Sequence, residues 1–68
     1  MTFGERLRQL REVAGLSQNE LAKRAHVPQS VISAVEGERQ KSVSLDAASR
    51  LADALGVSLD LLAGRAGR

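Results

Sequence analysis

A group of small polar side chains near the middle of the sequence is spaced to share one side of a helix. Ser33 follows Gln29 by four residues and Ser30 by three, and Ala34 follows Ser30 by four. Residues three and four apart are neighbours on a helix surface. Amide and hydroxyl groups both donate and accept hydrogen bonds, whereas Ala34 offers only a methyl group. Such a face is suited to recognising a polar partner by hydrogen bonding.

The chain offers no pattern typical of catalysis. It contains no cysteine, nucleophile–base pair, carboxylate dyad, metal-ligand cluster or glycine-rich phosphate loop. The single histidine, His26, has no carboxylate or second histidine at a useful spacing, so we interpret it as a turn residue. A chain of 68 residues also leaves little room for a cleft. We therefore expect no enzymatic activity, no metal and no cofactor.

Length and composition predict one small helical domain. Hydrophobic residues make up 43% of the chain but aromatic residues only 1%, so Leu, Ala and Val must fill the interior. That composition favours short, closely packed helices over a sheet. Without disulfides or a metal, such a domain depends on well-capped helices or on a partner subunit. The net charge of +2 permits a polyanionic partner without requiring one.

The first two predicted helices each begin with a capping box, in which a hydroxyl and a carboxylate satisfy free backbone N–H groups of the first turn. Thr2 and Glu5 form the first box, and apolar residues at helical spacing predict a helix over residues 3–14, ended by Gly15. Ser17 and Glu20 form the second box and predict a helix over residues 18–25.

Three more helices are predicted from residues that favour the start or the end of a helix. Pro28 is suited to the first turn of a helix that runs to residue 36, and residues 37–43 are predicted to form a loop. Ser44 caps a fourth helix that ends before Gly56, and Ser58 caps a fifth over residues 59–62. We therefore expect an all-α domain of five short helices over residues 1–64, followed by a flexible tail at 65–68.

The second and third helices are too close together to lie antiparallel. A connection of three or four residues forces short helices to cross steeply, which requires a small residue where they meet. Ala22 meets that need, His26 is placed to adopt a positive φ, and Val27 is an apolar plug. Ile32 and Val35 supply the inner face of the third helix. The polar set of Gln29, Ser30, Ser33 and Ala34 is then left on the outer face.

These segments resemble the Cro/lambda-repressor-type (XRE-like) helix-turn-helix family of bacterial and phage regulators. The resemblance is carried by GLSQNELA (15–22) and VPQSVIS (27–33), and by the flanking LRQLR (7–11) and LADALGVSL (51–59). It covers about residues 3–64. It implies a lambda-repressor-like fold with the helix-turn-helix at the second and third helices, and double-stranded DNA as the partner. It also implies a bacterial or phage-encoded protein.

The resemblance also implies roles for single residues. The third helix would enter the major groove, where Gln29 is the best candidate to pair with adenine. Ser30, Ser33 and Ala34 would face neighbouring bases. Arg11 and Glu36 match a family salt bridge between the first and third helices. The residues expected to contact phosphate are Ser17, Gln18 and Asn19 at the start of the second helix, and Arg39, Gln40, Lys41 and Ser42 in the loop.

The chain departs from the family pattern around the third helix. Glycine is commonest where this chain has His26, and Pro28 replaces the usual hydroxyl cap. Gly37 and Glu38 stand where the family often has Asn or Arg followed by Gly. The segment between Glu36 and Ser44 is also about one residue longer than in the family pattern. These departures affect the start of the reading helix and the loop contacts most.

The last predicted helix suggests a second surface. Leu59, Leu61 and Leu62 are more than a short helix needs to close a small core, so they either complete the core or, with Ala63, form a homodimer contact. A two-fold dimer would place two reading helices about 34 Å apart on a palindromic operator. The alternative is an antitoxin or protein-interaction module that binds a partner protein through this helix.

The sequence predicts a cytoplasmic protein with no part in a membrane. Its apolar stretches are far shorter than the ~20 residues that cross a bilayer. The N-terminus has no apolar signal region and is charged by Glu5. A DNA-binding role would associate the protein with the nucleoid.

Overall fold

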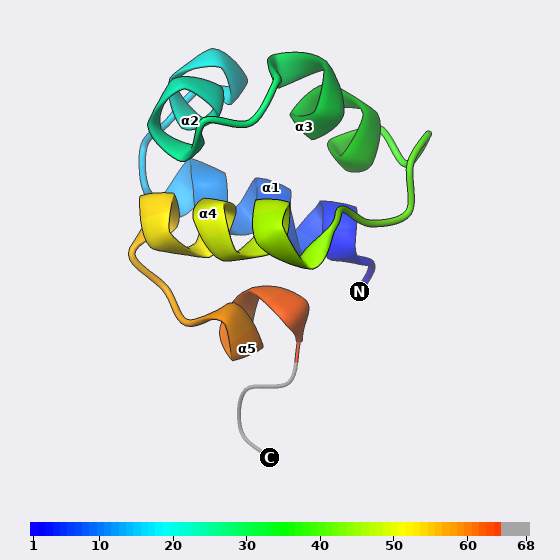
Figure 1. The fold of residues 1–68 in the computed structure, drawn as a ribbon. Coiled ribbons are helices and arrows are strands. Elements are labelled where there is room, and N and C mark those ends of the chain that lie inside the picture. Colours follow the sequence, from blue (N-terminus) through cyan, green and yellow to red (C-terminus); the bar gives the residue numbers. More distant parts are fainter. Residues whose placement is uncertain (65–68) are drawn as a thin grey trace.

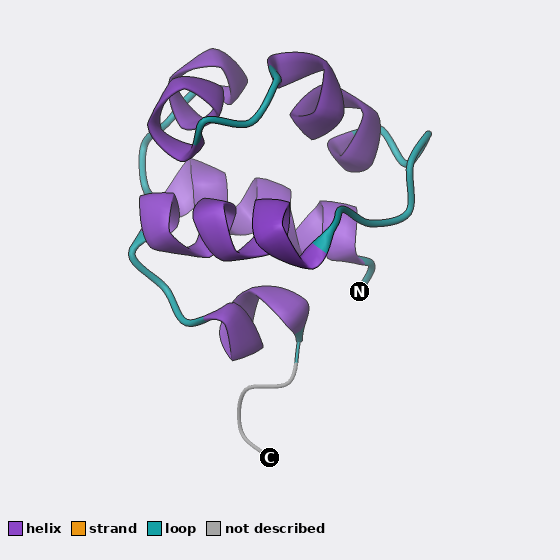
Figure 2. Cartoon of the chain, in the orientation of Figure 1, coloured by secondary structure: helices purple, strands orange, loops and turns teal. Residues whose placement is uncertain are grey.

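The computed structural model describes residues 1–64 of the chain. Over that range its regular secondary structure consists of helices joined by loops (Figure 2). The predicted all-α fold is confirmed. In chain order the helices are α1 (Phe3–Val13), α2 (Gln18–Ala25), α3 (Gln29–Glu36), α4 (Leu45–Leu55) and α5 (Leu59–Ala63). The flexible tail predicted at 65–68 lies outside the described residues.

The helices surround one core, with the α2–α3 pair on one side and α5 on the other (Figure 1). Helices α1 and α4 lie between them (Figure 1). The largest fully buried side chains of this core are Leu7, Leu21, Ile32, Val35, Leu51 and Leu62. Every helix contributes at least one of them, so no helix can be removed without opening the core.

Local capping sets where α1 and α2 begin. Thr2 accepts a hydrogen bond from the Glu5 N–H at 3.1 Å, and the Glu5 carboxylate accepts one from the Thr2 N–H at 2.9 Å. Ser17 and Glu20 repeat this exchange at 3.0 and 2.8 Å. Both predicted capping boxes are confirmed. Helix α1 is one residue shorter than predicted because residue 14 is its C-cap.

The turn between α2 and α3 has the predicted conformation. His26 ends α2 with φ 56° and ψ 44°, the left-handed region in which histidine is tolerated at modest cost. The next residue, Val27, is 5% exposed and donates from its backbone N–H to the Ala22 carbonyl at 3.1 Å. The chain therefore reverses over a buried apolar plug, which fixes the steep crossing of the two helices.

The two ends of α3 differ from the sequence-based expectation in detail. Pro28 is the N-cap and lies just outside the helix, and no side chain caps this end. The third helix thus begins at Gln29, one residue later than predicted, and its first backbone N–H groups remain open to solvent. At the other end Gly37 has φ −83°, while the following Glu38 adopts the positive φ of 62°.

Helices α4 and α5 close the far side of the core. The Ser44 hydroxyl accepts from the Ala47 N–H at 3.1 Å and the Ser58 hydroxyl from the Leu61 N–H at 3.0 Å, as expected of N-caps. Helix α5 extends to Ala63, one residue beyond the predicted end. Over the described residues, no helix is both long and apolar enough to cross a membrane.

Candidate nucleic-acid interface

The outer face of α3 is open at its N-terminal half and partly covered at its C-terminal half. Gln29 and Ser30 are exposed, whereas Ser33 and Ala34 are half-buried. All four lie away from the core, which is filled by Ile32 and Val35 from the inner face of the same helix. The predicted division of α3 into an inner and an outer face is therefore observed, and Gln29 is free to reach a partner.

The loop after α3 covers its second half. The backbone N–H groups of Arg39 and Gln40 donate to the Ala34 carbonyl at 2.8 and 3.1 Å. The Arg39 guanidinium turns back along the helix, and its Nη2 donates to the Ser33 hydroxyl at 3.2 Å. The partial burial of Ser33 and Ala34 is thus a consequence of how this loop folds.

The start of α2 presents hydrogen-bond donors. The Ser17–Glu20 capping box leaves the backbone N–H groups of Gln18 and Asn19 without an acceptor inside the helix. Hydrogen bonds from the backbone and side chain of Ser17 hold the pKa of Glu20 below its usual value, so this carboxylate stays ionised as a cap. Such helix starts attract anions through their N–H groups and the helix dipole.

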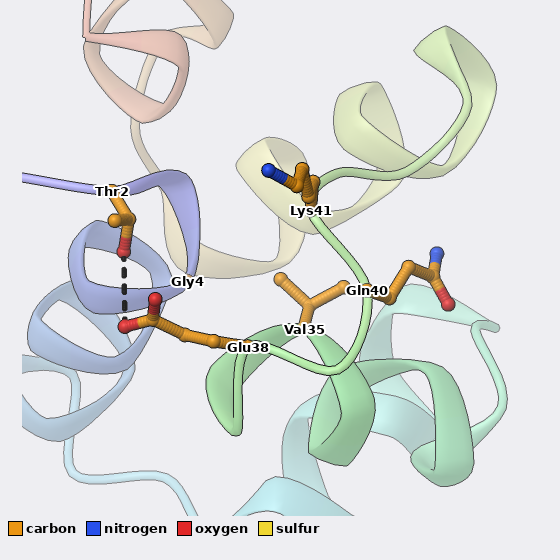
Figure 3. A pocket seen from close by; sticks show the side chains of 6 residues that line it. All are labelled: Thr2, Gly4, Val35, Glu38, Gln40 and Lys41. Atoms are coloured by element: carbon orange, nitrogen blue, oxygen red, sulfur yellow. Dashed lines mark hydrogen bonds between the residues drawn. The ribbon is translucent and has the colours of Figure 1, made fainter.

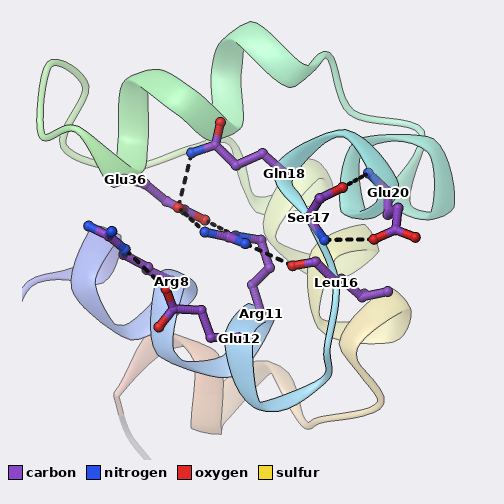
Figure 4. Close-up of polar contacts among 8 residues, drawn as sticks. All are labelled: Arg8, Arg11, Glu12, Leu16, Ser17, Gln18, Glu20 and Glu36. Carbon is purple, nitrogen blue, oxygen red and sulfur yellow. Dashed lines mark hydrogen bonds and ion pairs between the residues drawn. The ribbon is translucent and has the colours of Figure 1, made fainter.

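A largely buried ion pair joins α1, α2 and α3 beneath this surface (Figure 4). Arg11 donates from Nε and Nη2 to both carboxylate oxygens of Glu36, at 2.7 and 2.9 Å. Its Nη1 donates to the Leu16 carbonyl at 2.7 Å, in the connection between α1 and α2. The two charged side chains are only 12% and 3% exposed. The structure thus contains the salt bridge that the family resemblance implied.

Gln18 joins this ion pair, which the sequence analysis did not foresee. Its Nε2 donates to Glu36 Oε1 at 3.1 Å, which leaves one N–H of the amide available (Figure 4). The hydrogen bonds that Arg11 donates to Glu36 raise the pKa of Arg11, so the guanidinium stays charged. Glu36 is the only carboxylate of α3, and Arg11 neutralises it. The outer face of α3 therefore carries no unpaired negative charge of its own.

The remaining loop residues point in different directions. Gln40 donates from Nε2 to the Ser42 carbonyl at 2.7 Å, so its amide is used within the loop. Lys41 and Ser42 are exposed. Lys41 borders a hollow of about 310 Å³ between the start of α1 and the end of α3, where Thr2 donates to Glu38 at 3.5 Å (Figure 3). The four predicted loop residues therefore do not form one compact cluster.

Sequence reasoning missed two features that hold the site in place. Gly4, in the first turn of α1, lies directly against the Val35 backbone, so a Cβ atom there would overlap the Val35 carbonyl oxygen. Arg50 of α4 donates to the His26 carbonyl at 3.3 Å and pairs with Asp46 at 2.8 Å. For Gly4 the available signal was a glycine inside an otherwise good helix. For Arg50 the spacing of four residues from Asp46 indicated their ion pair, but nothing in the sequence pointed to the contact with His26.

Of the three leucines predicted to form the dimer contact, at most two are accessible to a second copy of the chain. Leu62 is fully buried between the helices, so its assignment to a contact between copies is wrong: its side chain completes the core of a single chain. Leu59 is half-buried, and Leu61 is 38% exposed. Only these two leucines of α5 remain accessible to a partner.

Two short helices that cross steeply over a buried plug, with a polar outer face and donors at the start of the first, define a helix-turn-helix unit. The comparison with family models agrees: residues 2–64 match the model described as a helix-turn-helix domain. The chain belongs to the helix-turn-helix domain family, a class of DNA-binding regulators. A search of curated proteins found no significant match. Within residues 1–64, no three His, Cys, Asp or Glu side chains group as a metal site.

Proposed function

We propose that this protein is a sequence-specific transcriptional repressor that binds as a homodimer to a palindromic operator and acts by occupying promoter DNA. One observation carries the proposal. The outer face of α3 exposes Gln29 and Ser30, while the only carboxylate of that helix is buried in an ion pair. A polar helix face without free negative charge is suited to the major groove, whose walls are lined by phosphates.

Direct base reading is assigned to the open half of α3. The Gln29 amide matches adenine, because it can donate to N7 and accept from N6 at the same time. Ser30 can pair with several bases and adds less selectivity. The half-buried Ala34 can contribute only apolar contact with a thymine methyl group. Ser33 was expected to face a base as well, but its hydroxyl accepts a hydrogen bond from Arg39.

Contacts with the DNA backbone are assigned to two segments on either side of α3. At the start of α2 these are Ser17, Gln18 and Asn19, through side chains and free backbone N–H groups. In the loop after α3 the residues assigned to phosphate contacts are Arg39, Gln40, Lys41 and Ser42. Arg39 and Lys41 also contribute positive charge. Phosphate contacts release counterions, so binding should weaken steeply as salt is raised.

Selection of DNA from a random duplex pool by the purified chain tests the proposal. We expect enrichment of one sequence with two inverted half-sites whose centres lie about one helical turn apart. Enrichment of a single half-site without symmetry would contradict the homodimer. Failure to enrich any sequence would contradict sequence-specific binding altogether.

The substitution Gln29→Ala tests base reading at a single residue. We expect it to weaken binding to the selected operator by about 1–3 kcal/mol and to leave binding to random duplex almost unchanged. Gln9→Ala, on the exposed surface of α1, is the matched control and should change neither. Titrations by fluorescence anisotropy measure both duplexes. Equal losses on operator and random DNA would remove Gln29 from the base-reading set.

The homodimer contact is assigned to the accessible apolar surface at α5. Leu59 of α5 and Leu45 of α4, which is 74% exposed, line a largely apolar hollow of about 440 Å³ between α1, α4 and α5. Leu61 is exposed on α5 outside this hollow. We expect Leu61→Glu to shift the protein to monomer in sedimentation experiments, because it would bury a charge at the contact. If the Leu61→Glu variant remains a dimer, the homodimer contact does not include Leu61.

The same apolar surface favours a second candidate, an antitoxin or protein-interaction module. In that case Leu45 and Leu61 would bind a different protein. The two candidates are separated by testing whether the purified chain, without a partner, shifts the DNA upstream of its own gene. A shift supports the repressor, and a shift seen only with a co-purified protein supports the module.

A further inference from the structure

A hollow of about 220 Å³ on the surface beside α3 is lined by three arginines and one carboxylate, Glu36. Arg8 and Arg11 of α1 line it from one side, Gln18 from the start of α2, and Ser33 and Arg39 from the end of α3 and its loop. Three arginines around one small hollow repel one another unless anions offset their charge.

The charges of the three arginines are offset to different degrees. Arg11 is neutralised by the bidentate contact with Glu36. Arg8 meets Glu12 at 3.4 Å, but their side chains are 62% and 57% exposed, and such a surface pair contributes little. Among residues 1–64, Arg39 makes no ion pair, because its side-chain hydrogen bond goes to the neutral hydroxyl of Ser33. The hollow therefore holds a net positive charge, mainly on Arg39 and Arg8.

The position of Arg39 is set by its surroundings. Its backbone is tied to the Ala34 carbonyl at 2.8 Å, after Glu38 turns the chain through a positive φ. Its guanidinium lies close to Gly37, where a Cβ atom would stand 3.5 Å from Nη1. The Ser33 hydroxyl then holds Nη2 at 3.2 Å. A long, flexible side chain is thus held at the hollow by a single hydroxyl, which leaves four of its five N–H donors available.

We propose that Arg39 and Arg8 clamp one phosphate of the DNA backbone in this hollow, and that Ser33 is a positioning residue for Arg39 and does not read a base. The free N–H of the Gln18 amide, which Glu36 holds at the rim, is a third donor to that phosphate. A guanidinium presents a planar set of donors that matches phosphate oxygens. The assignment rests on the proposed DNA-binding function and gives Ser33 a different role from the one the family resemblance implied.

The test compares binding to the selected operator and to random duplex, between about 50 and 200 mM salt. The variants are Arg39→Gln, Arg8→Gln, Ser33→Ala, and the doubles Arg8→Gln/Arg39→Gln and Ser33→Ala/Arg39→Gln. Arg6→Gln is the control for charge, because Arg6 lies against Gly64 at the end of α5. Thermal unfolding of each variant verifies that it is folded at the temperature of the binding assay.

We expect Arg39→Gln to weaken binding about tenfold on both duplexes alike, since a phosphate contact is independent of sequence. The double Arg8→Gln/Arg39→Gln should lower the salt slope by about 0.9, the value for one phosphate. Ser33→Ala should weaken both duplexes by a smaller factor without altering base preference. It should have no further effect once Arg39 is already glutamine, because its role is to hold the guanidinium.

Several outcomes would overturn the clamp. If Arg39→Gln weakens binding to the operator alone, Arg39 reads a base. If Ser33→Ala changes the preference at one base pair, Ser33 reads a base. A fall of about 1.8 in the slope for the double arginine variant would mean two separate phosphates. Effects of Ser33→Ala and Arg39→Gln that simply add would show that Ser33 acts independently. If the wild-type chain selects no DNA sequence, it is the proposed function that fails.

Discussion

Gly4→Ala should destabilise the fold by about 3 kcal/mol, although alanine is the better helix former. The added Cβ would overlap the Val35 carbonyl oxygen, and it would approach the Val35 carbonyl carbon and Glu36 Cα as well. All of these atoms belong to backbone, so no side-chain rotation can relieve the overlap. Helices α1 and α3 would have to move apart, which disturbs the contact that orients α3.

Thermal and chemical unfolding of Gly4→Ala measures this effect. Val13→Ala is the control on the same helix, because Val13 is almost fully exposed and its loss removes little packing. Helix propensity alone would predict that Gly4→Ala is stabilised by up to about 1 kcal/mol. Stability equal to or above that of the wild type would therefore show that α1 and α3 are not packed this closely.

Glu36→Ala should also have a large effect. We expect it to lower the free energy of unfolding by about 3–5 kcal/mol. The substitution leaves the Arg11 guanidinium, which is only 12% exposed, without its carboxylate partner. Removing one member of a buried pair costs more than the pair itself contributes, because the remaining charge stays desolvated. Gln18 would lose its hydrogen bond to Glu36 at the same time, so the phosphate contact proposed for Gln18 should weaken too.

The chain offers a matched control for this prediction. Glu12→Ala removes the partner of Arg8, but that pair is exposed and should cost less than about 1 kcal/mol. Replacing both buried partners, in Arg11→Met/Glu36→Leu, should recover much of the stability lost in Glu36→Ala. Similar losses for Glu36→Ala and Glu12→Ala would mean that burial of the Arg11–Glu36 pair does not contribute as described.

The sequence predicted the features that depend on local chemistry. The capping boxes at Thr2 and Ser17 involve residues three apart, and the structure contains both. The positive φ of His26 follows from its place between a short helix and a buried valine, and it too is observed. The salt bridge between Arg11 and Glu36 was predicted across 25 positions only because the resemblance to a family supplied the pairing.

The features that escaped prediction depend on packing between distant segments or on loop conformation. Gly4 reads as an ordinary helical residue until α3 is placed against it. Leu62 resembles Leu61 in the sequence, and only the angle at which α5 meets the core makes one buried and the other exposed. Arg39 and Gln40 looked alike as loop residues, yet one turns back to Ser33 and the other to Ser42.

We expect DNA to contact the outer face of α3 and the start of α2. The most direct measurement is a titration of the whole chain with its selected duplex, followed by backbone amide chemical shifts. We expect the largest changes at Gln18, Asn19, Gln29 and Ser30, and small changes around Asp60 on α5. Changes concentrated on α5, with Gln29 and Ser30 unaffected, would contradict DNA binding through α2 and α3.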